Sequence, residues 1–469
     1  MNKRSRTERK AAVRLDPALR PVLWVAILAS FVAFLDGAII NVALPAMTDD
    51  LGGGLALQQW VVDAYLLTLG ALILIAGSLS DGFGRVRILR LGLVLFGLAS
   101  LACALAPAGG VLIAARAVQG IGGALLVPSS LALIMSSYRD AAQGRAIGLW
   151  AGWTGTSAIA GPLLGGLLVD LFNWRWIFAI NVLPIAVTLV ILGRLKLETS
   201  VQGRPPLDVV GAVLAAVGLG GTVFALIEQQ RLGWSHPGVA VSLALGVVSF
   251  ALFLWWENRT AHPMMPLRLF RMRNFGIGNI ATALIYAALS LGMLVVVLFL
   301  QQVAGFSATE AGLATIPVAI LMLLLSGTFG GLAGRFGPRI FMAVGPLVIG
   351  AGYLMMTAVR IPVDFWTQLL PGLLVCGLGL AITVAPLTSA ILSAVGPGES
   401  GIGSAINNAV SRIAGLIAVA FAGVILGAVL DDDGFRRVLA VVAILAIAGG
   451  LVSAWGIRNL PAEAGPVNE

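Results

Sequence analysis

Three charged residues lie inside long apolar runs of the N-terminal half of the sequence: Asp36, Asp63 and Arg116. A charge in the hydrocarbon of a membrane costs about 2.5–3.5 kcal/mol on insertion scales, so it needs a partner, a neutral form or contact with water. Removing water from a carboxyl group favours its proton-bound form, whereas an arginine keeps its charge. We therefore predict that Asp36 and Asp63 are proton-coupling residues, and that Arg116 changes their protonation by approaching and withdrawing.

Each of these residues also has a plainer interpretation. Asp36 can be an acid near the membrane interface, although apolar residues continue on both sides of it. Asp63 can be an interfacial acid beside Trp60, or a group that recognises a cationic compound. Arg116 lies near the end of its apolar run, so its side chain can also extend to the surface.

Membrane-spanning helices must position these residues. The chain of 469 residues is 59% hydrophobic and only 11% charged, whereas a soluble domain is about 25% charged. A helix that crosses a membrane needs roughly 20 apolar residues, and glycine, which occurs 59 times, lets such helices pack closely. The sequence therefore predicts an all-α polytopic membrane protein. Its fourteen apolar runs lie at about residues 22–46, 57–78, 88–107, 111–136, 144–169, 174–193, 208–228, 238–256, 275–302, 309–332, 340–359, 365–392, 402–429 and 436–457.

The basic residues indicate how these runs are oriented. With a cytoplasmic N-terminus, most of the 29 Lys and Arg residues fall into cytoplasmic segments, as the positive-inside rule requires. An even number of spans then places both termini in the cytoplasm. The net charge of +8 follows from this topology, so we expect no nucleic-acid partner.

An internal repeat divides the spans. Residues 77–87 follow the second span and residues 330–339 follow the tenth, with Gly, Leu, Phe and Gly at matching offsets. Such a repeat predicts two related bundles of six helices, with the seventh and eighth spans inserted between them. The expected segments are a cytoplasmic tail at 1–20, an N-terminal bundle at 21–195, a linker with the two extra helices at 196–260, a C-terminal bundle at 261–460 and a tail at 461–469.

The first copy of this repeat combines glycines with opposite charges: Gly77, Asp81, Gly84, Arg85 and Arg87. Glycines let two helices meet closely, and the acid and the bases can form ion pairs that hold one conformation and break in another. The second copy has Gly334 in place of the acid, so we expect the stronger ion pairs in the first half. The alternative is a positive-inside loop without a switching role.

The fifth span contains glycines at four-residue spacing. Its most informative residues are Gly155, Gly161, Pro162 and Gly165. This spacing permits close helix packing, and the proline can kink the helix. On this ground alone the span can be a purely structural packing helix.

Taken in order, these segments resemble the motifs of the major facilitator superfamily, and most closely those of its fourteen-span drug:proton antiporter family. The Asp36 segment is similar to the first-helix motif, residues 77–87 to the loop motif, and residues 116–123 to the proton-transfer motif. The segment with Gly161 and Pro162 resembles the motif associated with antiporters. The segment at 174–184, with Asn181, and the segment with Asn407, Asn408 and Arg412 also fit.

The resemblance implies the major facilitator fold, with two six-helix bundles plus two inserted helices. It implies proton-driven export of drugs, antibiotics or other amphipathic small molecules by alternating access, from a cavity between the halves. The energy source is the proton gradient, and no cofactor is expected. We expect a monomer in the bacterial cytoplasmic membrane whose partners are the substrate, protons and the lipid bilayer.

Polar residues of several spans are candidates for lining the cavity, and each can equally be a packing residue. They are Asn41, Gln119, Trp153, Tyr286, Gln301, Asn407, Asn408 and Arg412. No acid lies in the middle of spans nine to fourteen, whereas antiporters of dicationic drugs can carry one there. The sequence therefore favours monocationic, neutral or zwitterionic substrates.

A proton symporter that imports a small nutrient is the main alternative, because it shares the fold, although it should lack the Gly161-Pro162 segment. A membrane enzyme would need a nucleophile, paired histidines or a metal cluster. The two cysteines lie in apolar runs, and the two histidines lack metal-ligand spacing. We therefore expect neither catalysis nor a bound metal. No loop is long enough for the signalling domain of a sensor.

Overall fold

The computed structural model describes residues 16–195, 207–395, 399–427 and 430–459, apart from the side chains of Asp81, Asp140, Ala141 and Ser400. All regular secondary structure in these ranges is helical. Fourteen helical segments are long and apolar enough to cross a membrane. The predicted fold class and the number of spans are confirmed.

The helices follow one another through short connections. In chain order they are η1 (Pro17–Leu19), α2 (Arg20–Leu51), α3 (Gly54–Phe83), α4 (Arg85–Ala104), α5 (Gly109–Ser137), α6 (Asp140–Gly155), α7 (Ser157–Leu171), α8 (Trp176–Ala179), α9 (Val182–Arg194), α10 (Val209–Leu232), α11 (Pro237–Glu257), η2 (Leu267–Arg271), α12 (Arg273–Gln302), α13 (Ala308–Phe336), α14 (Pro338–Met356), η3 (Phe365–Leu369), α15 (Leu370–Ser393), α16 (Ser400–Leu426) and α17 (Asp432–Gly456).

Two of the predicted spans are each built from two helices. The fifth span consists of α6 and α7, interrupted at Thr156. Pro162 in α7 has no N–H to donate to a carbonyl of the preceding turn, and the interruption lies shortly before it. The sixth span consists of α8 and α9, interrupted at Ile180 and Asn181.

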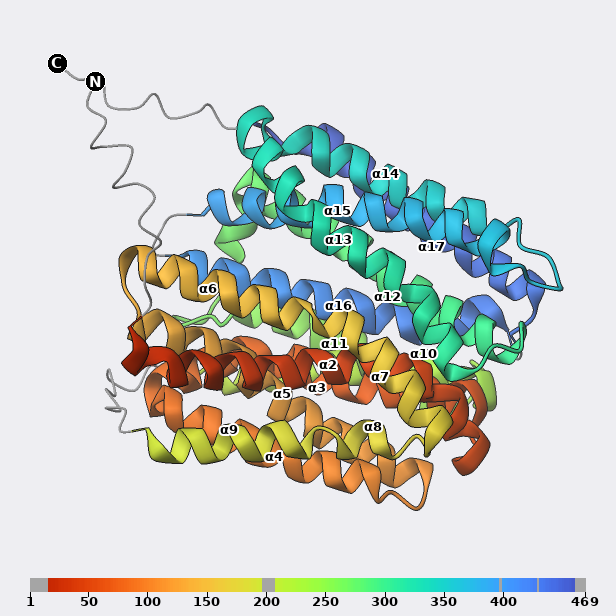
Figure 1. Ribbon diagram of the computed structural model, residues 1–469, viewed down its shortest axis with the longest axis horizontal. Helices are drawn as coiled ribbons and strands as arrows, with labels where there is room; N and C mark the ends of the chain where they lie inside the picture. Colours follow the sequence, from red (N-terminus) through yellow and green to blue (C-terminus); the bar gives the residue numbers. More distant parts are fainter. Residues whose placement is uncertain (1–15, 196–206, 396–398, 428–429, 460–469) are drawn as a thin grey trace.

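The helices lie side by side along the longest axis of the molecule (Figure 1). The first half, α2–α9, is drawn red to yellow and lies mostly below the second half, α12–α17, drawn green to blue, although α16 runs at the level of α6. We call the end at which α2 begins and α17 ends the tail end, on the left of Figure 1, and the opposite end the far end. The boundaries of the predicted domains stay a prediction.

The inserted helices α10 and α11 cover a seam between the halves. The two helices pack closely against each other: a Cβ on Gly221 of α10 would lie only 2.5 Å from the Ser242 carbonyl oxygen of α11. α10 also packs against α3 of the first half and α16 of the second. There Leu219 and Val223 form a buried cluster with Leu416. Through α10, the inserted pair therefore contacts both halves.

The two halves contact each other at the far end. α7 packs against α13, and Asp170 Oδ2 near the end of α7 accepts the backbone N–H of Thr309 at 2.8 Å. Gln301 Nε2 of α12 donates to the Val42 carbonyl of α2 at 3.1 Å. α6, the tail-end part of the same span as α7, packs against α2 and α5 of its own half, and its Trp153 is 48% exposed.

The internal repeat forms the same turn in both halves. Gly84 joins α3 to α4, and Gly337 joins α13 to α14. Their φ angles are +96° and +84°, in the left-handed region that glycine adopts without steric cost. This turn explains why glycine occupies the last matching position of the repeat.

Candidate functional site

A buried ion pair joins α2 and α5 in the first half. Arg116 Nη1 donates to Asp36 Oδ2 at 2.5 Å, and the two side chains are 1% and 0% exposed. The guanidinium also donates from Nε to the Val61 carbonyl at 2.9 Å and from Nη1 to Gln119 Oε1 at 2.7 Å. The sequence left both Asp36 and Asp63 open as partners of Arg116, and the structure pairs Arg116 with Asp36.

Two amides and a hydroxyl complete the surroundings of Asp36. Gln119 Nε2 donates to Asp36 Oδ1 at 2.8 Å and to Ser100 Oγ at 2.9 Å. Asn181 Nδ2 donates to Asp36 Oδ1 at 3.1 Å. Gln119, which the sequence suggested for the cavity, is fully buried in this network. We call these five residues, Asp36, Ser100, Arg116, Gln119 and Asn181, the charge network.

Aromatic rings enclose the cation of the charge network. The Tyr65 ring centroid lies 4.4 Å from Arg116 Cζ, and the Phe178 centroid lies 5.8 Å away. An ion pair so far from water depends on its partners. Removing one of them leaves an uncompensated charge, at a cost of about 3–5 kcal/mol.

Asp63 is buried on α3, away from Arg116. Its side chain is 0% exposed, and neither carboxylate oxygen has a hydrogen-bond partner among the described residues. Asp63 follows Gln59 by one helical turn, and Gln59 Nε2 donates to the Val419 carbonyl of α16 at 2.7 Å. Residues four positions apart share a helix face, so Asp63 lies on the side of α3 that faces the second half.

The predicted switch loop follows α3, and the structure accounts for part of it. Gly84 makes the turn described above, Arg85 is half-buried and Arg87 is exposed. Gly77 lies in α3 with no atom within 4 Å of the place of a Cβ, so close packing does not explain it. The side chain of Asp81 lies outside the described residues, and its ion pairs stay a prediction.

The glycines of α7 bring this helix against α2. A Cβ on Gly161 would lie 2.5 Å from Ala38 Cβ, and a Cβ on Gly165 would lie 2.6 Å from Ile39 Cγ1. Both contacts are closer than side chains tolerate, so glycine is required at this crossing. Ala38 and Ile39 immediately follow the Asp36-Gly37 pair, which places the crossing next to the charge network.

A neighbouring side of α7 meets α13 in the same way. A Cβ on Gly312 of α13 would lie 2.3 Å from the Pro162 carbonyl oxygen, and a Cβ on Gly166 would lie 2.5 Å from Thr309 Cα. Gly155 has open space around it and is the last residue of α6, beside the interruption. The predicted motif therefore combines two packing glycines and a proline with one glycine at a helix break.

A cavity of about 200 Å³ lies between the two halves. Its lining comes from α2, α3, α12 and α16 and consists of Phe34, Leu66, Tyr286, Ser290, Asn408, Ser411, Arg412 and Gly415. Three of the predicted cavity residues, Tyr286, Asn408 and Arg412, are among them. Phe34 precedes Asp36 by two positions, which puts their side chains on nearly opposite sides of α2. α2 thus separates this cavity from the charge network.

The other predicted cavity residues lie elsewhere. Asn407 Nδ2 donates to Asn279 Oδ1 at 3.2 Å and to Thr282 Oγ1 at 2.8 Å, which ties α16 to α12. Gln301 forms the far-end contact described above. Trp153 packs on Trp24 with ring centroids 5.6 Å apart.

Asn41 is half-buried on α2 and does not line this cavity. A polar residue in an apolar run indicates a face turned away from lipid. It does not tell whether that face meets a cavity or another helix.

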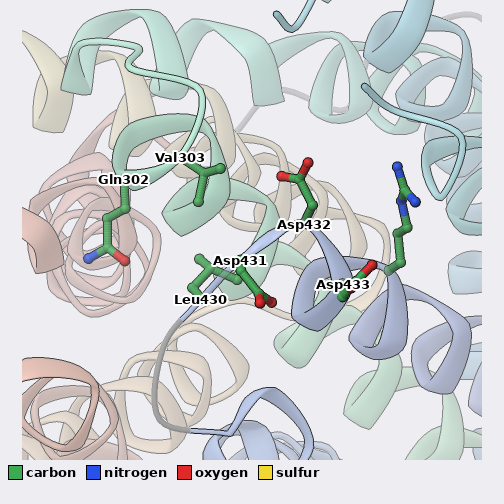
Figure 2. A pocket seen from close by; sticks show the side chains of 7 residues that line it. Gln302, Val303, Leu430, Asp431, Asp432 and Asp433 are labelled. Atoms are coloured by element: carbon green, nitrogen blue, oxygen red, sulfur yellow. The ribbon is translucent and has the colours of Figure 1, made fainter. Parts of the chain in front are cut away.

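A larger hollow of about 610 Å³ lies at the far end. Figure 2 shows three aspartates, Asp431, Asp432 and Asp433, beside it, with Gln302 and Val303. Asp431 Oδ1 accepts the Gly434 N–H at 2.6 Å and caps α17, and acids at the start of a helix are favoured by its dipole. These aspartates thus have a structural role at a helix end, remote from the charge network.

Sequence reasoning missed two members of the charge network. Asn181 belongs to a recognisable motif, but the motif does not identify it as a partner of Asp36, and the sequence gives no indication of a role for Ser100. The signal for Asn181 is an amide between apolar residues at the α8–α9 break. Ser100 gives no such signal, because serine is common as a small packing residue between membrane helices.

The chain matches known proteins over most of its length. The sequence model of the Major Facilitator Superfamily matches residues 26–419 and 278–469. The chain is 35% identical over 403 residues to Multidrug resistance protein Stp of Mycobacterium tuberculosis, covering 86% of this chain and 74% of that protein. It is 36% identical over 408 residues to Methylenomycin A resistance protein of Bacillus subtilis, covering 86% and 87%.

Among solved structures, the fold is similar to the crystal structure of peptide transporter POT in complex with sulfate. The TM-score is 0.70 at 16% sequence identity, over 97% of both chains, so this likeness concerns the fold alone. The fourteen apolar helices, together with the bacterial relatives, make the protein a multi-pass protein of a bacterial inner membrane. The chain belongs to the major facilitator superfamily, where it groups with multidrug and antibiotic resistance proteins, and it is a membrane transporter rather than an enzyme.

Proposed function

We propose that this protein is a proton-coupled secondary transporter that exports drugs, antibiotics or other amphipathic small molecules by alternating access. The observation that carries the proposal is the buried Asp36–Arg116 pair, which joins a titratable carboxylate to a permanent cation in the membrane part. The names of the relatives support export of antibiotics. The chain's own residues supply the coupling, and no cofactor is needed.

Protonation of Asp36 changes the balance of the charge network. The neutral acid still has Gln119 and Asn181 beside it, but Arg116 keeps its charge and loses its carboxylate. Charges interact strongly where the effective dielectric constant is low, and an unpaired buried charge is costly. The protonated state therefore favours a rearrangement of α2 and α5 that gives Arg116 new partners or water.

The packing of α2 connects this step to the closure of the far end. Ala38 and Ile39, just after Asp36, lie against Gly161 and Gly165 of α7. A neighbouring side of α7 packs against α13. A movement of α2 on protonation is thus passed directly to the helix that closes one end of the molecule.

The conformation itself fits one stage of the transport cycle. The far-end contacts join the halves, while the tail-end part of α6 packs on its own half. We assign the tail end to the cytoplasm, with both termini on that side, so this conformation faces the cytoplasm. Asp63, buried without a partner on the seam between α3 and α16, is a second proton-carrying residue whose surroundings change when the halves move.

The test separates proton coupling from substrate binding. A drug-sensitive bacterial host is screened with an antibiotic panel, with and without a protonophore, to find an exported compound. In inverted vesicles, Asp36→Asn should abolish transport of that compound driven by a pH gradient, because an amide at this position cannot take up or release a proton. Exchange of the compound between equal pools, which needs no proton step, should persist and shows that the variant is folded.

Asp49→Asn is the matched control, since Asp49 is an exposed acid on the same helix, and it should transport normally. If Asp36→Asn vesicles still accumulate the compound under a pH gradient, the coupling role is wrong. An exporter accumulates the compound inside inverted vesicles. If the wild type instead moves the compound out of them, the protein is a nutrient symporter.

A further inference from the structure

Arg412 is a cation at membrane depth that has no carboxylate partner. It lies in the middle of α16, lines the cavity between the halves and is half-buried. Across the part of the chain that the structure describes, it forms no ion pair and no hydrogen bond. Its one aromatic contact places Cζ 5.9 Å from the Phe34 ring centroid, at the outer limit of about 6 Å for a cation–π interaction.

Arg116 shows how an arginine is satisfied in the same membrane. It has a carboxylate, an amide oxygen and a backbone carbonyl within 2.9 Å. Arg412 has an equally permanent charge, and a charge in this position is costly. Its unused N–H donors therefore point to a partner that comes from outside the chain.

The charges around the cavity leave it positive. None of its lining residues is acidic. Asp36 lies across α2 and is bound by Arg116 and two amides. Asp63 lies on α3 nearer the far end, where it neither lines the cavity nor contacts Arg412. Among the described residues, no acid therefore neutralises Arg412 in this conformation.

The rest of the lining suits the body of a small amphipathic molecule. Phe34 and Leu66 provide apolar surface, and Tyr286 adds an aromatic ring with a hydroxyl group. Ser290 and Asn408 add polar groups beside the cation. The volume of about 200 Å³ lies below the common range of about 300–1,000 Å³ for ligand pockets, which favours small compounds.

We infer that this cavity binds the acidic group of an amphipathic substrate, so that the exported compounds carry a carboxylate or a similar anion. The inference rests on the proposed export function and names its substrate class. A guanidinium presents its donors in a planar fork that matches a carboxylate. The sequence favoured monocationic, neutral or zwitterionic compounds because membrane acids were lacking. The unpaired cation now disfavours monocations, while a zwitterion can still bind through its carboxylate.

Three probes that share one fluorophore and differ in charge test this inference. Dansylglycine is an anion, its methyl ester is neutral, and N-(2-aminoethyl)dansylamide is a cation. Their binding to the full-length protein is measured by dansyl fluorescence in phosphatidylcholine nanodiscs, which contain no anionic lipid to compete. The wild type should bind the anion at least about 10-fold more tightly than the other two probes, as expected for a charge-assisted bidentate contact.

Two variants assign that preference to Arg412. Arg412→Gln should lower the affinity for dansylglycine to that for the ester and leave ester binding unchanged, which also shows that the variant is folded. Arg412→Lys keeps the charge and should retain part of the preference. Arg271→Gln, which removes an exposed arginine of η2, is the control and should bind as the wild type does.

The inference is overturned if the wild type binds the three probes equally, if the cation binds best, or if Arg412→Gln keeps the preference for the anion. Binding in nanodiscs needs no proton step, so Asp36→Asn should also prefer dansylglycine. If the protein prefers the anion but shows no pH-driven export, the proposed function is wrong and this inference stands. If it shows pH-driven export of cationic compounds only, this inference is wrong and the proposed function stands.

Discussion

The two halves of the molecule bury different kinds of polar group. The first half buries Asp36, Asp63 and Arg116. In the second half, the buried polar side chains of the described residues are all uncharged: Asn274, Asn279, Thr282, Thr315, Thr383, Ser411 and Ser453. The contrast is visible between the fourth spans of the two predicted bundles, because α5 buries Arg116, whereas α15 buries the uncharged Thr383, which donates to the Gly379 carbonyl of its own helix.

This difference suggests a separate role for each half in transport. A proton can change the charge in the interior of the first half at Asp36 and Asp63, whereas the described interior of the second half holds no buried acid. The second half instead supplies Arg412, which faces the shared cavity. We therefore propose that proton coupling belongs to the first half and that recognition of the substrate's charge belongs to the second.

The largest expected effect compares the two arginines directly. Arg116→Gln leaves Asp36 buried without its cation and should destabilise the protein by about 3–5 kcal/mol. Arg412→Gln removes a costly cation that has no partner among the described residues, so it should leave the stability unchanged or raise it. Thermal unfolding of the purified variants in one detergent measures the difference, as a large fall in Tm for Arg116→Gln only.

A double variant sharpens this comparison. Asp36→Asn combined with Arg116→Gln removes both charges. The double variant should therefore lose less stability than the two single variants lose in sum. Strict additivity, or equal melting of the two arginine variants, would show that the ion pair contributes nothing to the first half.

A smaller effect is expected where the halves meet. Gly312→Ala places a methyl group 2.3 Å from the Pro162 carbonyl oxygen, and such overpacking costs about 1–3 kcal/mol. α7 and α13 must separate, so the far end should open more often and export should fall about 10-fold. Gly331→Ala is the matched control, because Gly331 lies on the same helix with open space around it.

Labelling measures the opening itself. Thr315 lies one turn after Gly312 and is 3% exposed. Thr315→Cys should react faster with a membrane-impermeant maleimide added from outside the cell when Gly312→Ala is present than when Gly331→Ala is present. Equal rates would mean that α7 and α13 do not close this end.

The sequence predicts the spans well and the contacts between them poorly. Fourteen runs are evident because lipid demands an apolar surface over the whole length of each helix. For the same reason the helices are apolar on most sides, so periodicity does not tell which faces meet. That α10 lies against both α3 and α16 could not be predicted for this reason.

The candidate site shows the same limit at the level of single residues. Asp36 and Arg116 are evident because a charge in an apolar run is costly, yet the choice between Asp36 and Asp63 as partner needed the fold. Glycines are equally ambiguous. Gly161 is required by a contact and Gly77 is not, although both lie in recognisable motifs.

The smallest expected effect tests whether Ser100, an uncharged member of the charge network, contributes to proton coupling. Ser100 and Ser453 are both fully buried, one in each half. Ser100 Oγ accepts from Gln119, inside the charge network, whereas Ser453 Oγ donates to the Gly449 carbonyl of its own helix. A side-chain hydrogen bond in a membrane contributes about 0.6 kcal/mol, so Ser100→Ala should slow pH-driven export about threefold. Ser453→Ala should leave the rate unchanged. The rates are compared in the same inverted vesicles at equal protein content, and an equal loss in both variants would confine the coupling to Asp36, Arg116 and their two amides.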